Sequence, residues 1–196
     1  MNRNCLLCGV GGQGVVLASK LIACAAMEKG LFVRTSETIG MAQRGGSVVS
    51  HVRMGEEVFS PMIPKGSADV ILAFEPAEAV RSLDYLRRGK EEGIVIVNQK
   101  GIQPVTGALG GREYDGREML DFLKEKVKRL YLVDGEEICR QAGSHKVLNV
   151  ALLGVAAASG ALLIDRAEME DEIRRRVKPR YQEMNLKALN LGAAMV

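Results

Sequence analysis

Residues 4–14 read Asn-Cys-Leu-Leu-Cys-Gly-Val-Gly-Gly-Gln-Gly. The first seven are mostly apolar and are followed by two glycines, which is typical of a buried strand in a parallel sheet. The last six have the spacing Gly-x-Gly-x-x-Gly, which allows a tight turn and lets backbone N–H groups face an anion. The apolar pattern of residues 14–29 predicts that a helix follows. A strand, a glycine turn and a helix in this order indicate a Rossmann-like α/β fold.

The alternation of strand and helix continues along the chain. Strands are predicted at 31–34, 69–74, 93–98 and 130–133, and helices at 76–88, at 116–127 and over most of the chain from residue 136 onward. Asp165 and Glu168 have the spacing of a capping box, and Pro179 separates the last two predicted helices. This pattern favours a doubly wound, mostly parallel sheet in three layers with a helical C-terminus. We expect residues 1–196 to form a single domain.

The region between the second strand and residue 69 is less regular. Residues 35–46 are polar and rich in glycine, and we interpret them as a long loop. Residues 47–53 alternate between apolar and polar, and together with residues 57–59 they predict a β-hairpin that turns at Gly55-Glu56.

The composition excludes several classes of function. The 196 residues carry a formal net charge of +3 and only four Phe and four Tyr, against 22 glycines. This charge is too small for a nucleic-acid or membrane surface, and few aromatic rings are available to stack on bases. The apolar stretch 147–164 is interrupted by Asn149 and predicts a buried helix. We therefore expect a cytoplasmic protein whose four cysteines are free thiols.

The first group of candidate binding residues is the glycine loop itself. Backbone groups of the loop would bind a phosphate or a dinucleotide, and Glu37, after the second strand, stands where a ribose-binding carboxylate is expected. The alternative is that the glycines only permit close packing between helix and strand. The candidates in this group are Gly9, Gly11, Gly12, Gln13, Gly14 and Glu37.

The second group lies in the segment 36–47, where Arg44, Gly45, Gly46 and Ser47 follow one another. Arginine offers a planar fork for a phosphate or carboxylate, and paired glycines can form an anion-binding nest. Both glycine segments follow strands, so both are expected at one crevice of the sheet. The alternative is an exposed loop without a ligand.

No residue is assigned a catalytic or metal-binding role. Cys5 and Cys8 stand three positions apart on a strand, so their sulfur atoms point to opposite faces. His51 and His145 have no neighbouring histidine or carboxylate at the spacing of a metal site.

Several motifs together resemble the gamma-type domain of 2-oxoacid:ferredoxin oxidoreductases, and in particular the small subunit of the enzymes that act on indolepyruvate. The most specific is the run Gly-Met-Ala-Gln-Arg-Gly-Gly-Ser over residues 40–47. Ile39 departs from the pattern, because the subfamily usually has a histidine there. The other matching residues are the glycine loop 9–14, Ser36-Glu37, the segment 74–79, Val97-Asn98, Pro104, Asn149, Leu153-Gly154, Asn185, Ala188 and Gly192.

The resemblance implies the CoA-dependent oxidative decarboxylation of an aryl-2-oxoacid with ferredoxin as acceptor. Thiamine diphosphate, magnesium and iron–sulfur clusters are then expected on a larger partner subunit, with ferredoxin contacted through the complex. This chain would contribute a contact to coenzyme A. The alternatives are a self-contained NAD(P)- or nucleotide-dependent oxidoreductase and a nucleotide-binding assembly module. We also expect a homodimer when the partner is absent.

Overall fold

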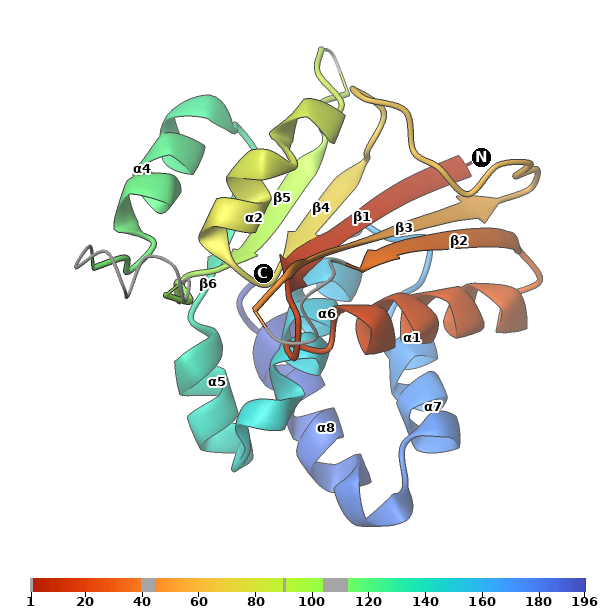
Figure 1. The fold of residues 1–196 in the computed structure, drawn as a ribbon. Helices are drawn as coiled ribbons and strands as arrows, with labels where there is room; N and C mark the ends of the chain where they lie inside the picture. The colour runs from red at the N-terminus through yellow and green to blue at the C-terminus, as the bar shows by residue number, and fades with distance from the viewer. Residues whose placement is uncertain (1, 40–44, 90, 104–112) are drawn as a thin grey trace.

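The computed structural model describes residues 2–39, 45–89, 91–103 and 113–196. Within these residues, six strands form one sheet in the order β2-β3-β1-β4-β5-β6 (Figure 1). β1, β4, β5 and β6 are parallel, whereas β3 is antiparallel to both β1 and β2. The predicted mostly parallel α/β fold is confirmed. The strands are β1 (Asn2–Val10), β2 (Phe32–Ile39), β3 (Ser47–Gly55), β4 (Val70–Ala73), β5 (Ile94–Asn98) and β6 (Leu130–Val133).

Helices cover both faces of the sheet, as a doubly wound fold requires (Figure 1). One face packs against α1 (Val15–Glu28), α5 (Gly135–Ala142), α6 (Leu148–Ala158), α7 (Arg166–Arg176) and α8 (Pro179–Ala193). The other face packs against α2 (Pro76–Arg81) and α4 (Arg117–Lys126). Two short 3₁₀ turns, η1 (Leu83–Tyr85) and η2 (His145–Val147), connect neighbouring elements.

The buried strands divide their side chains between two cores. Cys5 and Leu7 of β1 point into the core under α1 and α6, whereas Leu6 and Cys8 point into the core under α2 and α4. Because successive side chains of a strand alternate between faces, a strand covered on both sides must be apolar throughout. This explains why β1, β4 and β5 were predicted from short apolar runs.

The prediction of a loop over residues 35–46 is wrong at its beginning, because β2 continues to Ile39. β2 is an edge strand, and the side chains of Thr35, Glu37 and Thr38 are exposed. An exposed edge strand has a polar composition that resembles a loop, although its β-branched residues favour a strand. Residues 40–44 lie outside the described residues.

A β-hairpin is present, but its arms are β2 and β3. Ile39 pairs with Val48 and Phe32 with Gly55, whereas residues 57–59 belong to no strand. The guanidinium of Arg53 donates to the carbonyls of Ser60 and Met62, at 3.0 and 3.3 Å, and holds this part of the chain away from the ladder.

The predicted helix over 76–88 is shorter than expected. α2 ends at Arg81, the chain tightens into η1, and Leu86 then forms a bridge with Ala68. This turn brings Leu83 and Leu86 into the core under α2 and α4. The buried helix predicted in 147–164 is confirmed as α6, and the capping box of Asp165 and Glu168 is confirmed at the start of α7. None of the helices in the described ranges is long and apolar enough to cross a membrane.

Two glycines allow α6 and α8 to touch through their backbones. A Cβ atom at Gly154 would lie 2.1 Å from the carbonyl oxygen of Leu189, and one at Gly192 would lie 2.0 Å from that of Ala151. Contacts this short exclude any side chain, so the crossing of the two helices requires glycine at both positions.

We expect Gly154→Ala to destabilise the protein by about 2 kcal/mol, because α8 must move away from α6. In an ordinary helix the same change stabilises by about 1 kcal/mol, so the sign of the effect is diagnostic. Urea unfolding followed by circular dichroism measures it. Asn190→Ala, at an exposed position of α8, is the control and should change stability by less than about 0.5 kcal/mol. A stabilising Gly154→Ala would contradict the close contact.

His51 is a buried histidine on β3. Its Nδ1 accepts a hydrogen bond from the backbone N–H of Ile63 at 3.2 Å, and its ring meets that of Tyr85 edge to face at 5.6 Å. Burial lowers the pKa of His51, because the charged imidazolium would lose hydration. The folded state therefore favours neutral His51.

The lowered pKa predicts a loss of stability in acid. Because His51 binds a proton more weakly in the folded state than in the unfolded state, its stabilising contribution is present above the unfolded pKa of about 6.5. The contribution falls as the pH drops through the folded pKa. Urea midpoints at about pH 7.5 and about pH 5 should differ more for the native chain than for His51→Asn, whose Oδ1 can accept from Ile63 without titrating. Equal differences would show that His51 does not control this response.

Candidate functional site

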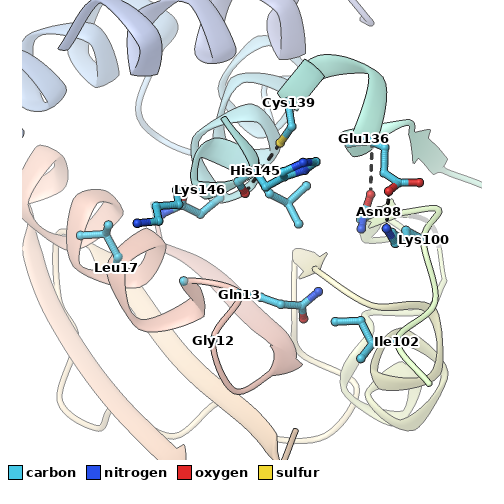
Figure 2. Close-up of a pocket in the computed structure, with 14 residues that line it drawn as sticks. Gly12, Gln13, Leu17, Asn98, Lys100, Ile102, Glu136, Cys139, His145 and Lys146 are labelled. Carbon is cyan, nitrogen blue, oxygen red and sulfur yellow. Dashed lines mark hydrogen bonds and ion pairs between the residues drawn. The ribbon is translucent and has the colours of Figure 1, made fainter. Parts of the chain in front are cut away.

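A cavity of about 500 Å³ lies at the carboxyl edge of the parallel strands. Its walls come from the loop after β1, the end of β5 and the beginnings of α5 and α6 (Figure 2). In open α/β sheets this edge is where ligands bind. Three residues of the predicted glycine loop line the cavity, namely Gly12, Gln13 and Gly14.

The glycine loop takes a conformation that side chains would disturb. Gly12 and Gly14 have positive φ angles of 102° and 83°, where glycine is strongly preferred. A Cβ atom at Gly9 would lie 2.8 Å from the Cβ of Phe74, and one at Gly14 would lie 3.0 Å from the Nδ2 of Asn149. Close packing therefore accounts for part of the glycine pattern. Because Gly12 and Gly14 also line the cavity, the loop is in a position to contact a ligand.

The side chain of Gln13 is folded back onto its own loop. Its Oε1 accepts from the backbone N–H of Val10 at 2.7 Å, and its Nε2 donates to the carbonyl of Phe74 at 2.8 Å. Gln13 thereby connects the end of β1 to the end of β4.

Asn98, the last residue of β5, makes a matching pair of contacts. Its Nδ2 donates to the same carbonyl of Phe74 at 3.2 Å, and its Oδ1 accepts from the N–H of Gly135 at 3.2 Å. The first residue of α5 is thus tied to the end of β5.

The second glycine segment lies directly beside the first. The N–H of Gly11 donates to the carbonyl of Gly46 at 2.8 Å, so the two segments meet, although Gly45, Gly46 and Ser47 do not line the cavity. Gly45 has a φ angle of 79°, and the hydroxyl of Ser47 donates to Oε2 of Glu78 at 2.5 Å. Arg44 lies outside the described residues, so its candidate role stays a prediction.

Glu37 is not brought to this cavity. It is exposed on the edge strand β2, which β3 separates from β1, and its Oε1 lies 3.4 Å from the hydroxyl of Ser19. In a dinucleotide-binding fold the ribose-binding carboxylate follows the strand beside β1, whereas here that neighbour is the antiparallel β3. The insertion of β3 therefore increases the distance between Glu37 and the glycine loop.

The charges at the cavity favour an anion. Lys100 forms an ion pair with Glu136, whereas Lys146 is exposed and forms no ion pair with any described residue. α1 begins at the cavity without a side-chain cap, and α6 begins there as a direct continuation of η2, whose first turn is capped by Ser144. Uncapped helix N-termini carry partial positive charge and offer N–H donors to negative groups.

Apolar side chains complete the walls. Leu17 and Ile102 are large hydrophobic residues that remain exposed, and both line the cavity. Cys139 is buried at its margin, where its Sγ lies 3.9 Å from the carbonyl of His145 (Figure 2). Burial raises the pKa of this thiol, so it stays protonated and is a poor nucleophile at neutral pH. The cavity thus suits a ligand with both an anionic and an apolar part.

A buried carboxylate network lies on the other side of the glycine segments. Glu75 caps α2 by accepting from the N–H of Glu78 at 3.0 Å, and its Oε1 accepts from the hydroxyl of Tyr114 at 2.5 Å. Burial, together with the adjacent Glu75, raises the pKa of Tyr114. These contacts fix the beginning of α2 and hold Ser47 near Glu78.

The cysteines and histidines are dispersed, as the strand geometry predicted. Cys5 and Cys8 lie in different cores, and burial raises the pKa of both thiols, that of Cys8 to about 12. Across the described ranges, no group of three or more His, Cys, Asp or Glu side chains could hold a metal ion.

Apart from the glycine loop, the sequence did not identify most of the residues that line the cavity. Most of the missed residues follow a strand or lie near the beginning of a helix far along the chain, so only the fold brings them to the glycine loop. Polar residues directly after predicted strands, such as Asn98, were the available signal. The missed residues include Asn98, Lys100, Gly135, His145, Lys146 and Asn149.

The comparisons with known proteins agree with this architecture. The model of the family "Pyruvate ferredoxin/flavodoxin oxidoreductase" matches residues 4–195. The chain is 40% identical to the indolepyruvate oxidoreductase subunit IorB of Archaeoglobus fulgidus, with 98% of this chain and 94% of the relative covered. It is 37% identical to the subunit of the same name from Thermococcus kodakarensis, with 96% and 93% covered.

A solved structure extends the likeness to the fold. The 2-oxoglutarate:ferredoxin oxidoreductase of Magnetococcus marinus, solved with 2-oxoglutarate, coenzyme A and succinyl-CoA bound, matches with a TM-score of 0.74 at 19% identity. The match covers 99% of this chain and 31% of the larger one. The same fold therefore occurs there as one part of a longer polypeptide.

Proposed function

Since the chain belongs to the pyruvate ferredoxin/flavodoxin oxidoreductase family, we propose that it serves an enzyme that oxidises aryl-2-oxoacids such as indolepyruvate. The chain is a small subunit of a 2-oxoacid ferredoxin oxidoreductase, which is an oxidoreductase that acts as a complex. Support for the aryl substrate is the identity of 37–40% over nearly the whole chain to subunits named for indolepyruvate.

The proposed reaction converts the 2-oxoacid, coenzyme A and two oxidised ferredoxins into an acyl-CoA, carbon dioxide, two reduced ferredoxins and a proton, which comes from the thiol of coenzyme A. Thiamine diphosphate supplies the stabilised carbanion and iron–sulfur clusters carry the two electrons, and both groups, with magnesium, are assigned to the larger partner subunit. Ferredoxin is reached through that partner. No residue of this chain is given a catalytic role.

The role proposed for this chain is to hold the anionic end of coenzyme A. The observation that carries it is the cavity where the uncapped α1 begins close to Lys146, a lysine that forms no ion pair with any of the described residues. Phosphate groups suit these donors, and the exposed Leu17 and Ile102 suit the apolar parts of the ligand. The proposed contacts include the backbone of the glycine loop 9–14 and the segment 44–47. Glu37 is not included, because it lies on β2, which β3 separates from β1.

The domain organisation, the cellular location and the self-association of the chain are also part of this proposal. We treat residues 1–196 as one gamma-type domain, located in the cytoplasm. Without its partner the chain is expected to pair with a second copy.

Purification from the native source tests the proposed function. A tag on this chain should recover a larger subunit that contains thiamine diphosphate and iron–sulfur clusters, and the recovered complex should reduce ferredoxin with indolepyruvate and coenzyme A. Recovery of the chain alone, together with tight NAD(H) binding and no response to coenzyme A, would instead support a self-contained nucleotide-dependent enzyme.

Lys146→Gln should weaken the binding of coenzyme A. We expect the KM for coenzyme A of the complex to rise about three- to tenfold with little change in kcat, because a charge that binds the ligand equally before and during reaction affects KM. The difference should shrink at high salt. Lys187→Gln removes the same charge from the exposed surface of α8 and is the matched control. An unchanged KM for Lys146→Gln would remove this lysine from the proposed site.

A further inference from the structure

We propose that Gln13 and Asn98 are positioning residues, which together fix the beginnings of α1 and α5 on opposite sides of the cavity through the carbonyl of Phe74. The effect on coenzyme A rests on the proposed function, whereas the mechanical connection does not. We call the chain of contacts from Val10 through Gln13, Phe74 and Asn98 to Gly135 the amide bridge.

The amide bridge is continuous. Gln13 accepts from Val10 at 2.7 Å and donates to Phe74 at 2.8 Å, and Asn98 donates to the same oxygen and accepts from Gly135, both at 3.2 Å. A carbonyl oxygen has two lone pairs, so the two donors occupy both acceptor positions of Phe74. The ends of β1, β4 and β5 and the first residue of α5 are therefore held by one set of hydrogen bonds.

Glycines at two positions make room for the bridge. A Cβ atom at Gly9 would lie 2.8 Å from Oε1 of Gln13, and a Cβ atom at Gly135 would lie 2.6 Å from Oδ1 of Asn98. Gly9 and Gly135 also lie in helical or extended backbone without a positive φ angle. A Cβ atom at Gly9 would also lie 2.8 Å from the Cβ of Phe74, and one at Gly135 would also overlap Cδ1 of Leu148. The amide side chains are therefore among the close neighbours that favour glycine at both positions, where the backbone conformation does not.

A primary amide suits this role, whereas a carboxylate or an apolar side chain does not. Each side chain must donate at one end and accept at the other, and a carboxylate of the same shape would direct a second oxygen at the Phe74 carbonyl. The bridge also stays neutral, so it leaves the positive character of the cavity intact. Asn98 is buried and Gln13 is partly buried, so water competes weakly for these hydrogen bonds.

The bridge determines where α1 and α5 begin at the cavity. α1 begins at Val15, two positions after Gln13, and α5 begins at Gly135, whose own N–H is held by Asn98. Gln13 and Asn98 both line the cavity, one from the loop after β1 and the other from the end of β5 (Figure 2). Both polar ends of Gln13 are already engaged, so direct recognition of a ligand would break existing hydrogen bonds. Its contribution is therefore to position the helices for a ligand.

Gln13→Met tests the bridge, because methionine keeps the length of the side chain without hydrogen bonds or charge. Amide hydrogen exchange of the whole subunit is measured by NMR at native conditions. We expect hydrogen exchange at the Gly135 N–H to accelerate about tenfold or more, although residue 13 does not touch it. The reason is that the Phe74 carbonyl loses its hydrogen bond from Gln13, so the Asn98 side chain that accepts from Gly135 is held less firmly. Gln13→Glu keeps the acceptor for Val10 but repels the Phe74 carbonyl, so it should give the same change if Gln13→Met does not fold.

Asp165→Ala is the matched control. It removes the cap of α7, which does not line the cavity, and should leave exchange at Gly135 unchanged relative to its neighbours in α5. Unchanged exchange at Gly135 in both Gln13 variants would overturn the amide bridge. The same acceleration in Asp165→Ala would overturn it too, because general loss of stability would then explain the result.

The kinetic arm separates this proposal from the proposed function. In the assembled complex, Gln13→Met should raise the KM for coenzyme A about tenfold with a smaller change in kcat and in the KM for the 2-oxoacid. If kcat and both KM values worsened by the same factor, Gln13 would have a purely structural role, and the positioning role would be contradicted. If the native complex does not respond to coenzyme A, the assigned ligand is wrong, whereas the exchange of Gly135 still decides whether the bridge exists.

Discussion

The structure depends on the hydrogen bonds that close the carboxyl end of β1. This strand is buried on both faces, so each backbone polar group at its end needs a partner from the protein. The carbonyl of Cys8 accepts from Phe74, Val10 donates to Gln13, and Gly11 donates to Gly46. Three loops are thereby drawn to one place. If water instead of the protein satisfied the backbone groups at the end of β1, these loops would not be held in fixed positions.

The same requirement explains the character of the cavity. Because α1 starts directly after these hydrogen bonds and α5 is tied to Asn98, the beginnings of two helices are fixed around one space. The backbone contact between α6 and α8 through Gly154 and Gly192 then places the beginning of α6 at the third side. Preorganised donors bind an anion without first losing conformational freedom.

The elements that the sequence predicted well are those whose surroundings are uniform. β4 and β5 are apolar because both faces are covered, and α6 is apolar because all its sides are buried. β2 was partly missed because an edge strand exposes polar side chains and so resembles a loop. In the site, the glycine loop was found from its spacing, whereas Lys146 and Asn149 carry no local signal of binding. Their importance comes from the cavity that they share with Gly14.

The sequence by itself determined the alternation of buried strands and helices, the turn at the glycine loop and the family, because these depend on local spacing and on which residues can be buried. Only the tertiary structure decided that β3 separates Glu37 from β1, that Gln13 and Asn98 share the carbonyl of Phe74, and that Lys146 lies at the cavity. These features depend on strand order and on contacts between distant segments. Side-chain periodicity reports which face a residue occupies, but it contains no information about which strand lies beside it.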